Sequence, residues 1–175
     1  MRELRIDLPL TEEAVRSLRA GDRVLLSGPV LTGRDAAHRR LFDALAEGRE
    51  PAVPLKGETV YYVGPCPAPP GRPVGSCGPT TSMRMDLLTP RLLQAGLRGM
   101  IGKGSRSPEV VEAMKQFGCV YFAAVGGAGA LYASRVTSCS VLAFPDLGTE
   151  AVHRMILKDF PVLVAVDCLG GSVYR

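Results

Sequence analysis

The sequence predicts an α/β fold with a mixed sheet, in a single domain over residues 1–175. Short apolar strand patterns alternate with capped helix patterns through the middle of the chain, as βαβ units require. Strand-like segments also lie at both ends, where we expect hairpin-like pairing instead of a clean doubly wound sheet. The chain has 175 residues, 46% of them hydrophobic, which is enough to bury a core.

The N-terminal elements follow from periodicity and capping. Apolar residues at positions 4, 6 and 8 alternate with polar ones and predict a strand. Thr11 is expected to cap a short helix. A strand over 23–27 is expected to end at Gly28, and a helix is predicted over 34–47 because its apolar residues fall on one face. Gly48 suits the position after that helix.

The remaining elements are marked by proline and glycine. A strand over 59–63 is expected to end at Gly64, and the proline-rich segment 66–78 is predicted to be a loop. Thr89-Pro90 and Ser107-Pro108 each predict a cap followed by proline at the first helical position, for helices that end near 95 and 117. Further strands are predicted over 97–101, 119–124, 136–144 and 162–166.

Composition excludes several classes of function. The net charge is +4, aromatic residues make up 6%, tryptophan is absent and the basic residues are dispersed, so nucleic acid is not an expected partner. The start has no apolar signal segment, and the longest uncharged stretch, 119–134, is too short to span a bilayer. We therefore expect a cytoplasmic protein. Five dispersed cysteines predict neither disulfides nor a metal site within this chain.

Three glycine-marked loops carry positive charge after predicted strands. In Gly33 to His38, Arg34 stands at a helix start, where free amides attract carboxylates or phosphates. Asp35 could hold its guanidinium, and His38, one turn later, could line the same site. Exposed charges at an ordinary helix start explain the segment equally well. In Gly102-Lys103-Gly104, glycines let a ligand approach the backbone, but Leu97 and Gly104 break the nucleotide-binding P-loop pattern.

The segment from Gly75 to Asp86 is the most informative one. Its single proline, two serines and two threonines offer hydroxyls and amides with little apolar pattern, which is unusual for a core element. Thr80 and Arg84 are four residues apart and would share a helical face. A structural alternative is a capped helix in which Arg84 and Asp86 are neighbours. The three loops together favour a small dianionic ligand, because arginine binds carboxylates in a bidentate manner.

Other candidate motifs are weak. Gly126-Gly127-Ala128-Gly129 lacks the third glycine of a dinucleotide-binding fingerprint, since position 132 is Tyr, so it predicts tight packing. The two histidines, His38 and His153, are too far apart in sequence to indicate a metal pair, and His153 is predicted to be structural.

Several of these segments resemble the class I fumarase β subunit, or C-terminal domain, and the related tartrate dehydratase β subunit. The resemblance runs in order from about Gly21 to Tyr174. It rests on Gly33–His38, Tyr61–Pro65, Gly75–Asp86, Ile101–Gly104, Asp146–Ala151 and Asp159–Pro161.

This resemblance implies a swivelling β/β/α domain that acts with an α subunit carrying a [4Fe–4S] cluster. It implies that Arg34, Arg84 and Lys103 bind the carboxylates of a small dicarboxylate and that Thr80 is the catalytic base, with Arg84 also catalytic. Thr81, or a proton relay through His38, is the alternative to Thr80 as the base. Asp35, His38, Thr81 and Asp86 are possible supporting residues around them. The expected reaction is reversible dehydration of (S)-malate to fumarate by an α–β hetero-oligomer. Tartrate dehydration and a non-catalytic anion-binding or assembly module are the alternatives.

Overall fold

The structure is a computed structural model that describes residues 3–174. Its elements are β1 (Glu3–Asp7), α1 (Glu12–Ser17), β2 (Arg23–Thr32), α2 (Asp35–Ala46), β3 (Thr59–Tyr61), the 3₁₀ helix η1 (Ser82–Met85), α3 (Thr89–Gln94), β4 (Gly99–Gly102), α4 (Pro108–Phe117), β5 (Val120–Ala123), α5 (Gly129–Ala133), β6 (Val136–Ala143), the 3₁₀ helix η2 (Pro145–Glu150) and β7 (Val152–Val166). The α/β fold with a mixed sheet is confirmed.

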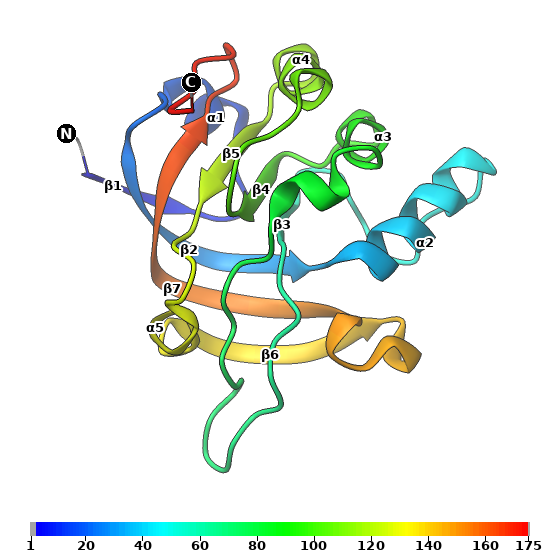
Figure 1. Cartoon of the computed structure of the whole chain (residues 1–175), viewed down its shortest axis with the longest axis vertical. Coiled ribbons are helices and arrows are strands. Elements are labelled where there is room, and N and C mark those ends of the chain that lie inside the picture. Colours follow the sequence, from blue (N-terminus) through cyan, green and yellow to red (C-terminus); the bar gives the residue numbers. More distant parts are fainter. Residues whose placement is uncertain (1–2, 175) are drawn as a thin grey trace.

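The strands form a closed ring with two extra strands attached. Strands β2, β3, β4 and β5 pair in parallel in that order, and β7 pairs antiparallel with both β5 and β2, which closes the ring. Strand β1 adds to β2 in parallel, and β6 adds to β7 antiparallel. Helices α2, α3 and α4 lie outside the β3–β4–β5 side of the ring (Figure 1).

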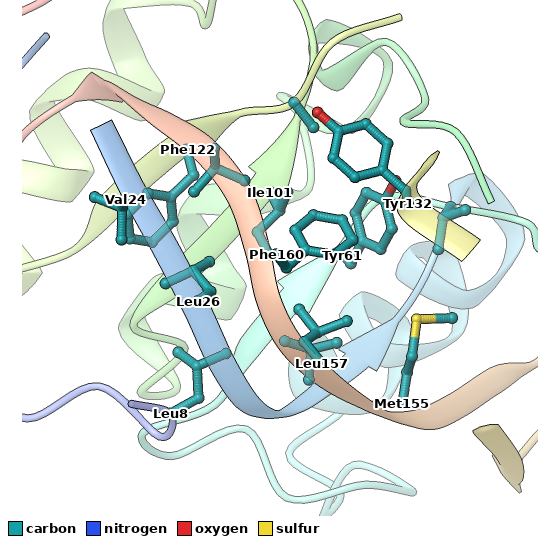
Figure 2. Packing of buried hydrophobic residues seen from close by; sticks show 14 of the residues in the cluster. Leu8, Val24, Leu26, Tyr61, Ile101, Phe122, Tyr132, Met155, Leu157 and Phe160 are labelled. Carbon is teal, nitrogen blue, oxygen red and sulfur yellow. The ribbon is translucent and has the colours of Figure 1, made fainter. Parts of the chain in front are cut away.

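Alternating side chains of the central strands build two apolar layers. Tyr61, Ile101 and Phe122 point into the ring, whereas the residues that precede them in each strand, Val60, Met100 and Tyr121, pack toward α2, α3 and α4. This is the period of two that a pleated strand imposes. Inside the ring, Phe160 of β7 meets the ring of Tyr61 edge-on at 5.3 Å and stacks on Tyr132 of α5 at 4.5 Å (Figure 2).

Two strands are longer than predicted. Strand β2 does not end at Gly28 but continues to Thr32 through a bulge at which Gly28 has φ of 122°. Strand β7 begins at Val152, ten residues before the predicted start. Asp159 adopts a left-handed φ of 48° inside β7, and this bulge interrupts the apolar alternation on which the prediction depended.

The predicted N-terminal hairpin is wrong, because β1 pairs with β2 in parallel and α1 forms the connection. The hairpin-like pairing at the other end is confirmed by β6 and β7. Thr11 and Ser107 cap α1 and α4 as predicted. Thr89 does not cap α3, since the N-cap is Leu88 and the Thr89 hydroxyl donates to the carbonyl of Met85. Among residues 3–174, no helix is long and apolar enough to cross a membrane.

Candidate functional site

The predicted site residues gather where the four parallel strands end. Arg34 follows β2, Gly64 follows β3, Lys103 follows β4 and Gly126 follows β5. In parallel α/β sheets, ligands bind outside the carboxyl ends of the strands. The three cationic loops are therefore brought to one edge of the sheet, although they are dispersed over 70 residues of sequence.

Asp35 joins the two arginines of the site. Arg84 of η1 donates from Nε to Oδ1 of Asp35 at 3.0 Å, and Nε of Arg34 lies 3.9 Å from Oδ2 of the same carboxylate. Asp35 is the first residue of α2, where the free amides of a helix start favour a carboxylate. The predicted supporting role of Asp35 thus has a geometric basis, because its one carboxylate contacts both guanidinium groups.

Arg34 crosses the end of β3. An added Cβ at Gly64 would lie 3.1 Å from Cδ of Arg34 and 3.2 Å from its Nη1, so a larger residue would require Arg34 to shift. Nε of Arg34 also lies 3.5 Å from Oε1 of Glu150, at the end of η2. In the sequence, Glu150 is marked only as part of the Asp146–Ala151 segment of the family resemblance. No local pattern predicts its contact with Arg34.

Thr80, Thr81 and Ser82 form an extended strap across the ends of β3 and β4. The Thr80 amide donates to the carbonyl of Tyr62 at 2.7 Å, and the Lys103 amide donates to the carbonyl of Thr80 at 3.3 Å. The Ser82 amide donates to the carbonyl of Lys103 at 2.9 Å. Thr81 and Lys103 are paired in parallel fashion. The backbone therefore holds the predicted base and the predicted cation next to each other.

Gly102 makes this strap possible. A Cβ at Gly102 would clash with the Ser82 hydroxyl and lie 2.7 Å from a ring carbon of Tyr62. Lys103 itself is half-buried, and its side chain runs past Gly126, where an added Cβ would lie 3.6 Å from Nζ. Among the described residues, no carboxylate forms an ion pair with Lys103, and the Thr80 hydroxyl makes no hydrogen bond. Both groups are available to a ligand.

His38 lies beneath Arg34 and does not line an open site. Its imidazole is buried, and Nδ1 donates to the carbonyl of Arg34 at 2.8 Å, because a carbonyl can only accept. Nε2 is left buried without a partner among the described residues. Burial lowers the pKa of His38 from 6.5 to about 4. The side chain is therefore neutral at physiological pH and positions the start of α2.

The buried imidazole predicts a pH-dependent stability. Between about pH 6.5 and pH 4, the unfolded chain takes up a proton at His38 that the folded chain does not, so the free energy of unfolding falls as the pH falls. At about 1.4 kcal/mol per pH unit, the full effect is about 3 kcal/mol. We expect His38→Gln to lose this part of the dependence in denaturant unfolding across that range.

The half-buried His153 provides the matched control. Burial also lowers its pKa, but the residue is only half-buried, whereas His38 is fully buried and therefore loses more hydration. His153→Gln should therefore keep most of the parent's dependence on pH. Parallel stability curves for the parent and His38→Gln would contradict the prediction.

Asp86 does not neighbour Arg84 in the way the structural alternative supposed. Its Oδ1 accepts from Nε of Arg106 at 2.7 Å, and its Oδ2 accepts from the Ser107 amide at 2.6 Å. Arg106, whose side chain is 0% exposed, is a residue that sequence reasoning missed. Its position just before the Ser107 cap indicates an exposed charge, and no local pattern signals that the side chain folds inward.

Three cations and two carboxylates make this edge suited to an anion. Asp35 and Glu150 offset part of the charge of Arg34 and Arg84, while Lys103 adds one more cation. Side chains with fixed partners are preorganised, which matters when charge develops on a bound anion. The substrate-binding roles assigned to these residues stay predictions, since the contacts explain their positions and not their ligand.

The cysteines do not form a metal-ligand group in the described part of the chain. Cys77, Cys119 and Cys168 are buried, Cys139 is half-buried and Cys66 is exposed. Within residues 3–174, no group of three or more histidine, cysteine or acidic side chains has an arrangement that could hold a metal ion. The described residues therefore provide no ligand set for an iron–sulfur cluster by themselves.

A sequence model of the family described as Fumarase C-terminus matches residues 1–175. The chain belongs to this family. Relatives within it include the anaerobic class I fumarate hydratase of Escherichia coli strain K12, which is 36% identical over 156 residues, and fumarate hydratase 2 of Leishmania major, 37% identical over 157 residues. These alignments cover 87% and 88% of this chain but 28% of each relative. The chain thus spans less than a third of their length.

A third relative has a similar length. A Methanocaldococcus jannaschii protein, provisionally named L(+)-tartrate dehydratase subunit beta, is 33% identical over 176 residues. That alignment covers 95% of this chain and 88% of the relative. Family members are therefore named both for fumarate hydration and for tartrate dehydration, and one of them is named as a subunit.

Proposed function

We propose that the chain is the β subunit of an iron–sulfur fumarate hydratase, which reversibly dehydrates (S)-malate to fumarate. The observation that carries this proposal is the arrangement of Arg34, Arg84 and Lys103 on separate loops at one sheet edge, in a member of the Fumarase C-terminus family. A dicarboxylate would engage these cations from both of its ends. Paired arginines suit carboxylates because each guanidinium presents a planar fork of donors.

The proposed chemistry uses the cations in the transition state. Dehydration of malate removes a proton from the carbon next to a carboxylate, and negative charge gathers on that carboxylate until the hydroxyl leaves the neighbouring carbon as water. A cluster iron on the partner subunit would assist this departure as a Lewis acid. Arg84 is held by Asp35 before the reaction starts, and Arg34 and Lys103 lie at the same site, so these cations would stabilise the developing charge more than the ground state. We assign Thr80 to the reacting carbon as the base: as the alkoxide, stabilised by the neighbouring cations Lys103 and Arg84, it would accept the C–H proton and become the neutral hydroxyl.

We place a [4Fe–4S] cluster on a partner α subunit. The described part of this chain has no ligand set for it, and the name of the Methanocaldococcus relative supports the existence of a partner. The functional unit in this proposal is an α–β hetero-oligomer in the cytoplasm. The contribution of this chain is to bind and orient the dicarboxylate.

Tartrate dehydratase is the second candidate, and the alignment over most of a tartrate dehydratase β subunit favours it. Both substrates are dicarboxylates with a hydroxyl beside a carboxylate. The same three cations therefore serve either one, and the two reactions must be separated by assay.

Anaerobic reconstitution tests the proposal. The chain is combined with a cluster-bearing α subunit, and (S)-malate, fumarate and L(+)-tartrate are each assayed with the pair and with either subunit alone. We expect malate–fumarate turnover by the pair, and an inactive, colourless preparation of this chain alone. A preference for tartrate would select the second candidate, and a cluster bound to this chain alone would overturn the division between subunits.

A further inference from the structure

A buried arginine lies behind the segments that carry Arg84 and Lys103. Arg106 lies three residues after Lys103, and its guanidinium donates to four side chains from separate segments of the chain. Nε bonds Asp86 after η1, Nη2 bonds Thr89 in α3 at 3.0 Å, and Nη1 lies 3.2 Å from both the Tyr62 hydroxyl and Sδ of Met100 in β4. One side chain therefore ties the turn that carries Arg84 to the strands beneath it.

Two tyrosine rings enclose this guanidinium. Its carbon lies 5.3 Å from the ring centre of Tyr62 and 5.0 Å from that of Tyr121. The Tyr121 hydroxyl donates to the carbonyl of Gly104 at 2.8 Å and lies 2.9 Å from the Ser82 hydroxyl. The ring that packs on Arg106 therefore also joins the Lys103 loop to the strap. The backbone of Tyr62 supports Thr80 in the same way.

Stability alone does not account for such a pair. A buried ion pair contributes little to stability compared with apolar residues of the same size, because both charges lose their hydration. What the pair provides is a fixed orientation of the groups around it, since one guanidinium can hold several partners at once. Here the partners are the supports of the strap and of the Lys103 loop.

We propose that Arg106, held by Asp86, is a positioning residue that sets the spacing between the Thr80–Ser82 strap and Lys103. It would do so without touching the substrate. The kinetic part of this inference rests on the proposed function, whereas the structural part does not. Two backbone hydrogen bonds report on the spacing directly, namely Ser82 amide to Lys103 carbonyl and Lys103 amide to Thr80 carbonyl.

The first test is amide hydrogen exchange on the full chain carrying Arg106→Lys. Lysine keeps the charge beside Asp86 but lacks the fork that reaches Thr89 and Tyr62. We expect exchange at the Ser82 and Lys103 amides to accelerate at least tenfold, with no change at the Val120 amide, which bonds the carbonyl of Arg98 away from the site. Arg154→Lys, in the half-buried pair with Glu58, is the matched control and should leave all three amides unchanged.

A second variant guards against loss of folding. Arg106→Met combined with Asp86→Leu removes both charges without leaving either one buried alone, so it is expected to fold. The same two amides should again exchange faster. Parent-like exchange at Ser82 and Lys103 in either folded variant would overturn the inference. Failure of both variants to fold would also reject it, because Arg106 would then be a determinant of stability.

The kinetic readout is taken in the reconstituted pair. We expect Arg106→Lys to raise the KM for the dicarboxylate about tenfold and to lower kcat, while Arg154→Lys keeps both values. A pair without hydratase or dehydratase activity would refute the proposed function and leave the exchange result standing. Accelerated exchange with unchanged KM and kcat would refute the positioning role and leave the proposed function standing.

Discussion

Arg84→Ala is expected to lower kcat/KM of the reconstituted enzyme by about 100-fold or more, because one preorganised cation is lost where charge develops. The side chain of Arg84 is 52% exposed and bonds only Asp35 among the described residues. Its removal should therefore leave the fold intact. Kinetics on malate and fumarate measure the effect, and denaturant unfolding of the isolated chain checks the fold.

Two further variants sharpen this experiment. Arg49→Ala removes the same charge from an exposed pair with Glu47, beyond the end of α2, and should keep parent activity. Arg84→Lys keeps the charge but not the fork of donors, so an intermediate rate is expected. Near-parent activity of Arg84→Ala would instead support a non-catalytic anion-binding or assembly role for this chain.

Asp86→Ala is expected to lower the free energy of unfolding by about 3–5 kcal/mol, because it leaves the guanidinium of Arg106 buried without a counter-charge. The two side chains are 0% and 6% exposed, so water cannot replace the lost carboxylate. The Ser107 amide, at the start of α4, loses its partner as well. Urea unfolding followed by circular dichroism measures the loss.

An exposed pair provides the control for Asp86. Asp146 of η2 accepts two hydrogen bonds from Arg40 of α2, but its side chain is 62% exposed. Solvent and salt screen such a pair, so Asp146→Ala should change stability little. Equal losses in the two variants would contradict the claim that burial determines the cost.

Local patterns predicted the helices well and the strand pairing poorly. Ser107-Pro108 with Gly118 defines α4 because caps act within a few residues. Strand β7 was missed over most of its length because Lys158, Asp159 and Pro161 interrupt its apolar pattern. This strand forms because it pairs with β2, and that pairing joins residues 123 to 140 positions apart in sequence. Such long-range partners leave no local signal.

The candidate site could likewise be predicted only in part, because some of its features are local in the sequence and others depend on distant segments. Glycines beside Arg34 and Lys103 mark loops where a backbone approaches a ligand, and this is a local property. The partners of these residues come from distant segments, as Glu150 does for Arg34 and Asp35 does for Arg84. The sequence suggested that His38 could line the site, whereas the structure buries it under Arg34. This burial depends on the packing of α2 against Tyr62, which no local pattern predicts.

Closure of the strand ring by β7 also determines where the sheet can grow. Every strand in the ring has partners on both sides, so only β1 and β6 present an unpaired row of backbone groups within residues 3–174. Strand β1 is short and carries exposed charges at Glu3, Arg5 and Asp7, which discourage pairing with another chain. Strand β6 is eight residues long without a charge. An extended segment from another molecule would therefore add to this sheet at β6, and not at β1.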